Sequence, residues 1–95
     1  MKIIIMKITL RAIWVRSLKE KRMVVKSLVK RLQNKFNISV SEVENQDIHK
    51  NIVIGISGVC IDKKQADSIM ENIINFVYEN TDAEVIDINT NIDVY

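Results

Sequence analysis

The stretch IIIMKITLRAIWVRSLKEKR, residues 3–22, contains a strand, the start of a helix and the boundary between them. Apolar side chains recur at every second position of residues 4–14, which is the pattern of a strand with one buried face. Ser17 followed by Glu20 matches a capping box, so the spacing predicts a helix from about Leu18. The strand residues expected to point inward are Ile4, Met6, Ile8, Leu10, Ala12 and Trp14.

The predicted helix has two chemically different sides. Apolar residues at spacings of three and four are expected to pack on the sheet, and Asn37 is expected to end the helix. These apolar residues are Leu18, Val25, Leu28, Val29, Leu32 and Phe36. The opposite side carries Lys19, Arg22, Lys26 and Lys30.

Two further strands are predicted after this helix. A short alternating strand begins at Ile38, and residues 52–60 form the next, so the polar segment 44–51 is expected to be an elaborated hairpin loop. Gly55 and Gly58 lie inside the second of these strands. Glycine within a strand predicts a bulge or a close backbone approach.

A second helix and a fourth strand complete the pattern. Asp62 with Gln65 forms another capping box, and residues 80–82 are expected to end the helix. The predicted buried stripe is Ala66, Ile69, Met70, Ile73 and Val77, and the inward side chains of the last strand are Ile86, Ile88, Thr90, Ile92 and Val94. The βαββαβ order predicts an α+β fold of the split βαβ type, with a four-stranded antiparallel sheet and both helices on one face. We expect residues 1–95 to form a single domain.

Composition narrows the class of protein. Hydrophobic residues make up 47% of the 95-residue chain and charged residues 27%, which is enough apolar material for a core. Cys60 is the only cysteine, so no internal disulfide can form and a reducing cytoplasm is expected. The apolar segment 1–6 is too short for a signal-peptide core, and no run approaches the roughly 20 apolar residues of a membrane span.

Charge is divided unequally along the chain. Residues 1–50 carry twelve lysines and arginines against four acids, a net charge of +8, whereas residues 51–95 carry two lysines against eight acids, a net charge of −6. Between Lys2 and Lys35 only Glu20 is acidic. Clustered cations of this kind are typical of a surface that binds nucleic-acid phosphates, although an anionic protein partner or a merely solvated helix face would fit as well. The candidate nucleic-acid-binding residues are Arg11, Arg16, Lys19, Lys21, Arg22, Lys26 and Lys30.

The expected absence of aromatic residues from the open sheet face argues against RNA recognition by the sheet. The open sheet face is expected to carry no Phe, Tyr or Trp on its central strands, so there is nothing there for bases to stack on. Trp14 lies close to Arg11 and Arg16 and could stack on a base, but its alternation with Leu10 and Ala12 favours burial at the edge of the core.

No catalytic or metal-binding constellation is visible. Glu44, Gln46, Asp47 and His49 form a candidate interaction loop, and a histidine near carboxylates can act as an acid, a base or a ligand. A lone histidine is more often a solvated side chain, and a metal site needs three or four ligands. Cys60 has inward parity, and no glycine-rich phosphate loop is present. We therefore expect neither an enzyme nor a bound cofactor.

Two segments resemble a known family. SLKEKR at residues 17–22 and the run from Val40 to Asp47 are similar to the YlxP-like family of small bacterial proteins. The motif residues are Ser17, Lys19, Glu20, Lys21, Arg22, Glu42, Gln46 and Asp47. The resemblance implies a ferredoxin-like fold and supplies no catalytic residues. Members are often encoded beside translation-initiation and ribosome-binding factors, which implies a role at the ribosome by association.

These observations lead to two functional hypotheses. The first is a non-enzymatic protein that binds structured RNA through the basic first helix. Its partner would be ribosomal RNA or a ribosomal subunit. The second is a homodimeric scaffold whose open sheet face pairs with its copy and whose basic helix meets an acidic protein.

Overall fold

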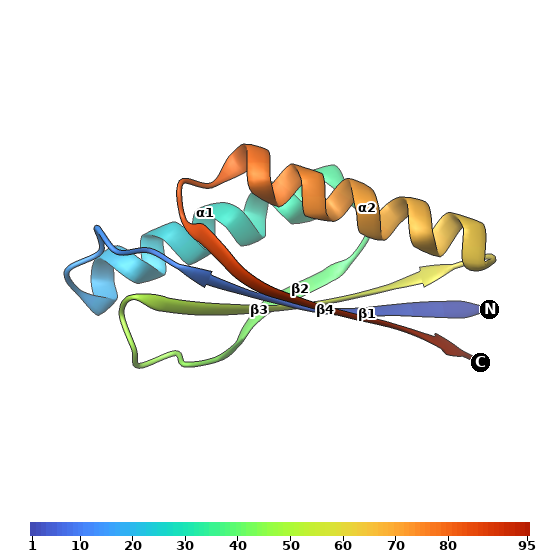
Figure 1. The fold of residues 1–95 in the computed structure, drawn as a ribbon, viewed down its shortest axis with the longest axis horizontal. Coiled ribbons are helices and arrows are strands. Elements are labelled where there is room, and N and C mark those ends of the chain that lie inside the picture. The colour runs from blue at the N-terminus through green and yellow to red at the C-terminus, as the bar shows by residue number, and fades with distance from the viewer.

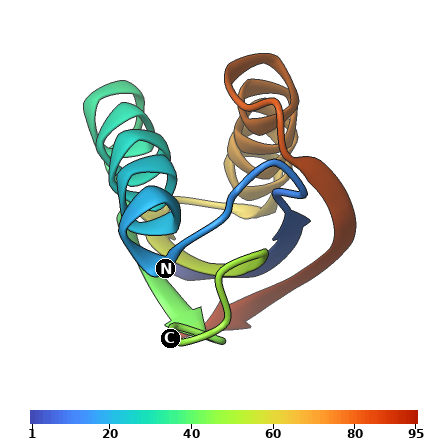
Figure 2. The same ribbon diagram turned by 90° about the vertical axis from the view of Figure 1, so that its left-hand side faces the viewer.

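Two strand–helix–strand units build the protein, and the computed structural model describes all of residues 1–95. The elements are β1 (Lys2–Arg11), α1 (Leu18–Lys35), β2 (Ser39–Glu44), β3 (Asn51–Cys60), α2 (Lys63–Asn80) and β4 (Glu84–Val94). Every strand pair is antiparallel, and the strand order is β2-β3-β1-β4. Both helices cover one face of the sheet, side by side (Figures 1 and 2). The predicted ferredoxin-like α+β fold is confirmed.

Side-chain caps fix where both helices begin. The Ser17 hydroxyl accepts a hydrogen bond from the Glu20 amide at 3.1 Å, and the Glu20 carboxylate accepts one from the Arg16 amide at 3.1 Å. Asp62 and Gln65 repeat this arrangement at α2, where the Asp62 carboxylate accepts from the Gln65 amide at 2.8 Å. Each cap satisfies amide donors that have no partner within the helix, so both predicted helix starts are confirmed.

The core lies between the helices and the inner face of the sheet. Ile4, Met6, Ile8 and Leu10 of β1 are almost fully buried, because β1 is a central strand of the sheet whose inner face the helices cover. The helix residues buried against the sheet include Val25, Leu28 and Leu32 of α1 and Ala66, Met70, Ile73 and Val77 of α2. Phe36 and Phe76 close the core in an edge-to-face contact with ring centroids 5.6 Å apart.

Strand β4 departs from the predicted alternation. Thr9 pairs with Asp87 and Leu10 pairs with Val85, so one residue of β4, Ile86, has no partner in β1. Such a bulge turns the extra side chain out of register, and Ile86 is 51% exposed while Val85 packs against the core. The prediction that Ile86 points inward is therefore wrong.

A second bulge lies at the end of β2. Glu42 pairs with Ile54 and Glu44 with Val53, which leaves Val43 as the extra residue. Val43 lies over Gly55, where a Cβ atom would come within 2.7 Å of Val43 Cγ1. The neighbour that crowds Gly55 is thus the side chain of Val43, whereas the strand glycines predicted a bulge or a close backbone approach.

The first strand ends earlier than predicted. β1 stops at Arg11, and a turn closed by the Val15 amide and the Ala12 carbonyl at 3.2 Å replaces its last residues. Ala12 and Val15 are buried by this turn, whereas Trp14 is 42% exposed. The prediction that Trp14 is buried is wrong, because strand alternation no longer applies beyond Arg11.

Three connections meet at one end of the molecule. The β1–α1, β2–β3 and α2–β4 connections lie at the left in Figure 1, and both termini lie at the opposite end. At that end, the terminal amine of Met1 donates a hydrogen bond to the Tyr95 carbonyl at 2.9 Å. The Tyr95 amide donates one to the Met1 carbonyl, also at 2.9 Å.

Candidate nucleic-acid interface

Four cations form a continuous line along α1. Lys19, Arg22, Lys26 and Lys30 follow one another at spacings of three and four residues, so they share one side of the helix, and all four are exposed. At a rise of about 1.5 Å per residue this line is about 16 Å long, with about one positive charge per helical turn. We call these four residues the basic stripe.

Two more cations of α1 lie on its other side, toward α2. Arg31 donates a hydrogen bond from Nη1 to the Asn80 carbonyl at 3.4 Å, and Lys35 lines a hollow together with residues of α2 such as Glu79. Both side chains are exposed. Their charges therefore extend the positive surface of α1 toward the groove between the two helices.

The remaining candidates, Arg11 and Arg16, lie apart from each other. Arg16 is exposed in the β1–α1 connection, immediately before the start of α1. Arg11 has the outward parity of β1, on the sheet face opposite the helices, and is the register partner of Glu84. Only Arg16 thus lies beside the basic surface of α1.

Lys21 is not part of that surface. Its side chain is fully buried, and Nζ lies 2.7 Å from Glu42 Oε2, although at an angle outside the hydrogen-bond range. The same ammonium donates hydrogen bonds to the carbonyl oxygens of Asn45 and Ile48, the latter at 2.8 Å. The Lys21 ammonium is thus engaged inside the protein, by two backbone carbonyls and by the nearby Glu42 carboxylate. The prediction that Lys21 contacts nucleic acid is therefore wrong.

Lys21 instead holds the β2–β3 connection in place. Asn45 adopts a φ of 58°, and its carbonyl also accepts a hydrogen bond from the Ile48 amide at 3.0 Å, which closes a turn. Gln46 and Asp47 occupy the tip of this turn and are exposed. The turn presents both side chains to solvent beside the N-terminal part of α1.

The other residues of the candidate interaction loop do not gather into one site. Glu44 forms an ion pair with Lys7 of β1 at 3.0 Å. His49 is half-buried, and no hydrogen bond or ion pair joins it to Asp47 or Glu44. No group of three or more His, Cys, Asp or Glu side chains is placed to hold a metal ion, and Cys60 is buried.

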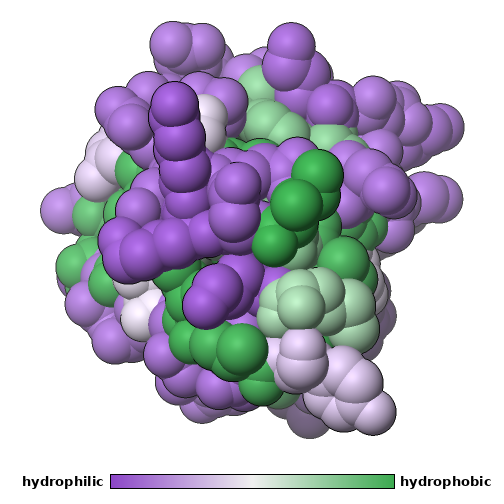
Figure 3. Space-filling view, turned by 90° about the vertical axis from the view of Figure 1, so that its right-hand side faces the viewer, coloured by the Kyte–Doolittle hydropathy of each residue, from purple (hydrophilic) through white to green (hydrophobic).

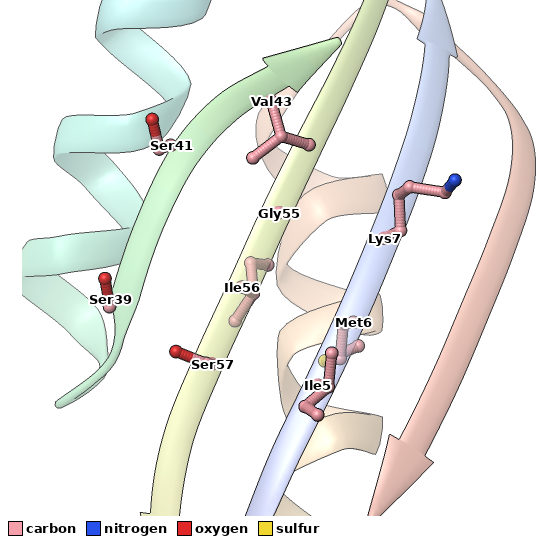
Figure 4. A pocket seen from close by; sticks show the side chains of 9 residues that line it. All are labelled: Ile5, Met6, Lys7, Ser39, Ser41, Val43, Gly55, Ile56 and Ser57. Carbon is pink, nitrogen blue, oxygen red and sulfur yellow. The ribbon is translucent and has the colours of Figure 1, made fainter.

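The open sheet face contains a shallow hollow of about 370 Å³ (Figure 4). The hydroxyls of Ser39, Ser41 and Ser57 surround it, with Ile5 and Val43 as apolar neighbours. No aromatic side chain lines this hollow. The sheet face therefore offers no stacking platform, in line with its sequence.

A second hollow, which sequence reasoning missed, lies beside α1. Its volume is about 320 Å³ and we call it the Trp14 hollow; it is lined by Trp14, Met23, Val24, Ser27, Leu28, Arg31, Asn80, Thr81 and Asp82. One sequence signal could have indicated it. Met23 lies among the cations of α1, outside the apolar stripe, and is 66% exposed.

The end of the molecule that carries the termini is chemically different. Apolar side chains gather there over the ends of β1, β3 and β4 (Figure 3), and the exposed ones are Met1, Val59, Ile61 and Val94. Neither helix is long and apolar enough to cross a membrane. This apolar end lies opposite the β1–α1 connection, from which α1 and its basic stripe begin.

Similar proteins agree with the fold and identify the family. The de novo designed protein Foldit4 superposes with a TM-score of 0.53 over 98% of each chain at 11% identity, which reflects the fold alone. The uncharacterized protein YlxP of Bacillus subtilis (strain 168) is 39% identical over 61 residues, which cover 64% of this chain and 66% of that protein, just under two thirds of its length. Residues 3–90 match the family described as "Protein of unknown function (DUF503)". The chain therefore belongs to this YlxP-like family, as its SLKEKR segment predicts.

Proposed function

We propose that this protein is a non-enzymatic binding protein of the cytoplasm that associates with structured RNA of the ribosome through the basic stripe of α1. The observation that carries the proposal is the lack of any neutralising partner along the stripe. None of its four side chains has a carboxylate within 4.0 Å, since the ion pairs of the protein are Lys7–Glu44, Lys21–Glu42 and Lys63–Asp67.

An unneutralised line of cations is costly to the free protein. Like charges three and four residues apart on a helix repel one another, and mixed-sign pairs would stabilise the same helix. The one acid of α1, Glu20, is engaged at the cap with the Arg16 amide. Phosphate groups of an RNA backbone would relieve the repulsion and release condensed counterions on binding.

Salt dependence tests this proposal. The double variant Lys26→Ala/Lys30→Ala removes two charges from the stripe, and Lys63→Ala/Lys64→Ala removes two from the start of α2 as a matched control. Binding of ribosomal RNA fragments would be measured by fluorescence anisotropy across a range of salt concentrations. We expect the stripe variant to lower the slope of log K against log[salt] by about 0.7–0.9 for each phosphate that is no longer bound, and the control to leave it unchanged.

Two results would contradict the proposal. One is binding that does not depend on salt, and the other is an equal effect of the two double variants. Co-sedimentation with ribosomal subunits at low salt, repeated after nuclease treatment, separates RNA from an acidic protein as the partner. If the protein stays bound to the ribosomal proteins after nuclease treatment, the partner is an acidic protein.

A homodimer is a second candidate, favoured by one observation on the open sheet face. Ile5, Val43 and Val59 are 41%, 48% and 66% exposed there, and a second copy would cover them. Sedimentation equilibrium at high micromolar concentration tests this candidate. A monomer under those conditions would remove it without affecting the RNA-binding proposal.

A further inference from the structure

We infer that the Trp14 hollow receives an unpaired nucleotide whose base stacks on the indole of Trp14. This inference rests on the proposed function and specifies the class of RNA: single strands, loops or bulges, as opposed to a continuous duplex. Aromatic side chains are the usual platform for unstacked bases, because every base has a π-face.

The protein holds Trp14 at the surface by fixing the chain on both sides of it. The Ala12 amide bonds to the Lys50 carbonyl at 2.9 Å, and the Lys50 ammonium donates to the Ile13 carbonyl at 2.9 Å. Val15 is fully buried directly after Trp14. These contacts leave the large aromatic side chain 42% exposed and lining a concave site.

The hollow is continuous with the basic stripe. Met23 and Ser27 line the hollow. Residues three or four apart are neighbours on a helix surface, so Met23 lies beside Lys19 and Lys26. Ser27 lies beside Lys30 for the same reason. A strand bound along the stripe would therefore pass the mouth of the hollow. A base turned out of that strand could reach Trp14 while its phosphates stay on the lysines.

The remaining lining suits a nucleotide in one orientation. Arg31 lies on the α1 wall, and only one of its donors is engaged, with Asn80. Thr81 Oγ1 accepts from the Ala83 amide at 3.1 Å, which leaves its O–H free to donate. Asp82, on the opposite wall from the stripe, repels phosphate and accepts hydrogen bonds from a base amino group or a ribose 2′-hydroxyl.

The intrinsic fluorescence of Trp14 tests the inference directly, since Trp14 is the only tryptophan of the chain. The probes are a labelled ten-nucleotide oligouridylate, the matching oligoadenylate, and a blunt duplex of the same length. With the single strands we expect fluorescence quenching that saturates in step with the anisotropy of the RNA. With the duplex we expect weaker binding and little quenching.

Variants separate stacking from charge. Trp14→Ala should weaken single-strand binding by about 5- to 100-fold, and Trp14→Phe should retain most of it, because a phenyl ring still stacks. Tyr78→Ala removes an exposed aromatic outside the hollow and should change nothing. Circular dichroism checks that each variant is folded. If Trp14→Ala does not fold, the quenching of Trp14 in the unaltered protein still tests the inference.

The outcomes distinguish this inference from the function on which it rests. Salt-dependent binding without quenching, or equal affinity for single strand and duplex, overturns the Trp14 site and leaves the basic stripe as the interface. No binding of any RNA overturns both.

Discussion

Glu42 Oε2 lies 2.7 Å from Lys21 Nζ, with the lysine side chain fully buried and the glutamate side chain 15% exposed. The pair joins the first turns of α1 to the end of β2, and the carbonyls of Asn45 and Ile48 complete the surroundings of the ammonium. Both segments that carry the family resemblance thus meet at one buried charge. The contact gives Lys21 and Glu42 a structural place in the fold, between α1 and β2.

Replacement of Lys21 by Met should destabilise the protein strongly. The variant leaves Glu42 without its partner and two carbonyls without a donor, and breaking a buried ion pair from one side costs about 3–5 kcal/mol. Urea unfolding at neutral pH measures the loss. The double variant Lys21→Met/Glu42→Leu should recover part of it, because no uncompensated carboxylate remains.

Lys63→Ala provides the control for this prediction. Its ion pair with Asp67 is exposed, with side chains 74% and 51% accessible, so its loss should cost less than about 1 kcal/mol. Equal stability of Lys21→Met and Lys63→Ala would show that the buried pair has no special role.

Gly55→Ala should destabilise the sheet although alanine suits a strand better than glycine. The new Cβ would lie 2.7 Å from Val43 Cγ1, and overpacking of this kind costs about 1–3 kcal/mol. Gly58→Ala is the milder companion, since its Cβ would meet Ile38 Cγ2 at 3.2 Å. In urea unfolding, Val43→Ala combined with Gly55→Ala should be more stable than Gly55→Ala alone; no such rescue would exclude the contact as the cause.

The sequence contained a signal for Lys21 that residue type obscured. Lys21, Val25, Leu28 and Leu32 are buried at spacings of four, three and four, so the lysine occupies a position of the apolar stripe. Because Lys21 is charged, the sequence alone groups it with the solvent-exposed cations of the helix. Its carboxylate and carbonyl partners come from β2 and the following turn, which helix periodicity cannot reveal.

Trp14 and Ile86 show that the periodicity of a strand likewise cannot reveal what its neighbours do. Alternation predicts the inward residues of β1 up to Leu10, and the sequence pattern predicts the order of the elements. Where a strand stops, and where a bulge shifts its register, depends on the neighbouring strand. The pairing of Leu10 with Val85 moves Ile86 outward, and the turn after Arg11 exposes Trp14. Strand alternation therefore could not place Trp14 in the hollow beside α1, and only the exposed Met23 pointed to that surface.

Asn45 should respond in opposite ways to two substitutions. Its φ of 58° lies in the left-handed region, which glycine adopts freely and alanine adopts at a cost of about 1 kcal/mol. Asn45→Gly should therefore be close to neutral in thermal unfolding, whereas Asn45→Ala should lower the melting temperature by several degrees. Equal melting temperatures would mean that the turn does not need this backbone conformation.

The bulge in β4 predicts which isoleucine of that strand matters for stability. Ile86 is 51% exposed, so Ile86→Ala should change the free energy of unfolding by less than about 0.5 kcal/mol. Ile88 pairs with Ile8 and packs against the core, but it is only half-buried. Ile88→Ala should therefore cost about 1–2 kcal/mol, less than the roughly 2–5 kcal/mol of a fully buried isoleucine. Urea unfolding of the two variants under identical conditions gives the comparison. The opposite order would place Ile86 inside, as simple alternation predicts, and would contradict the register of β1 with β4.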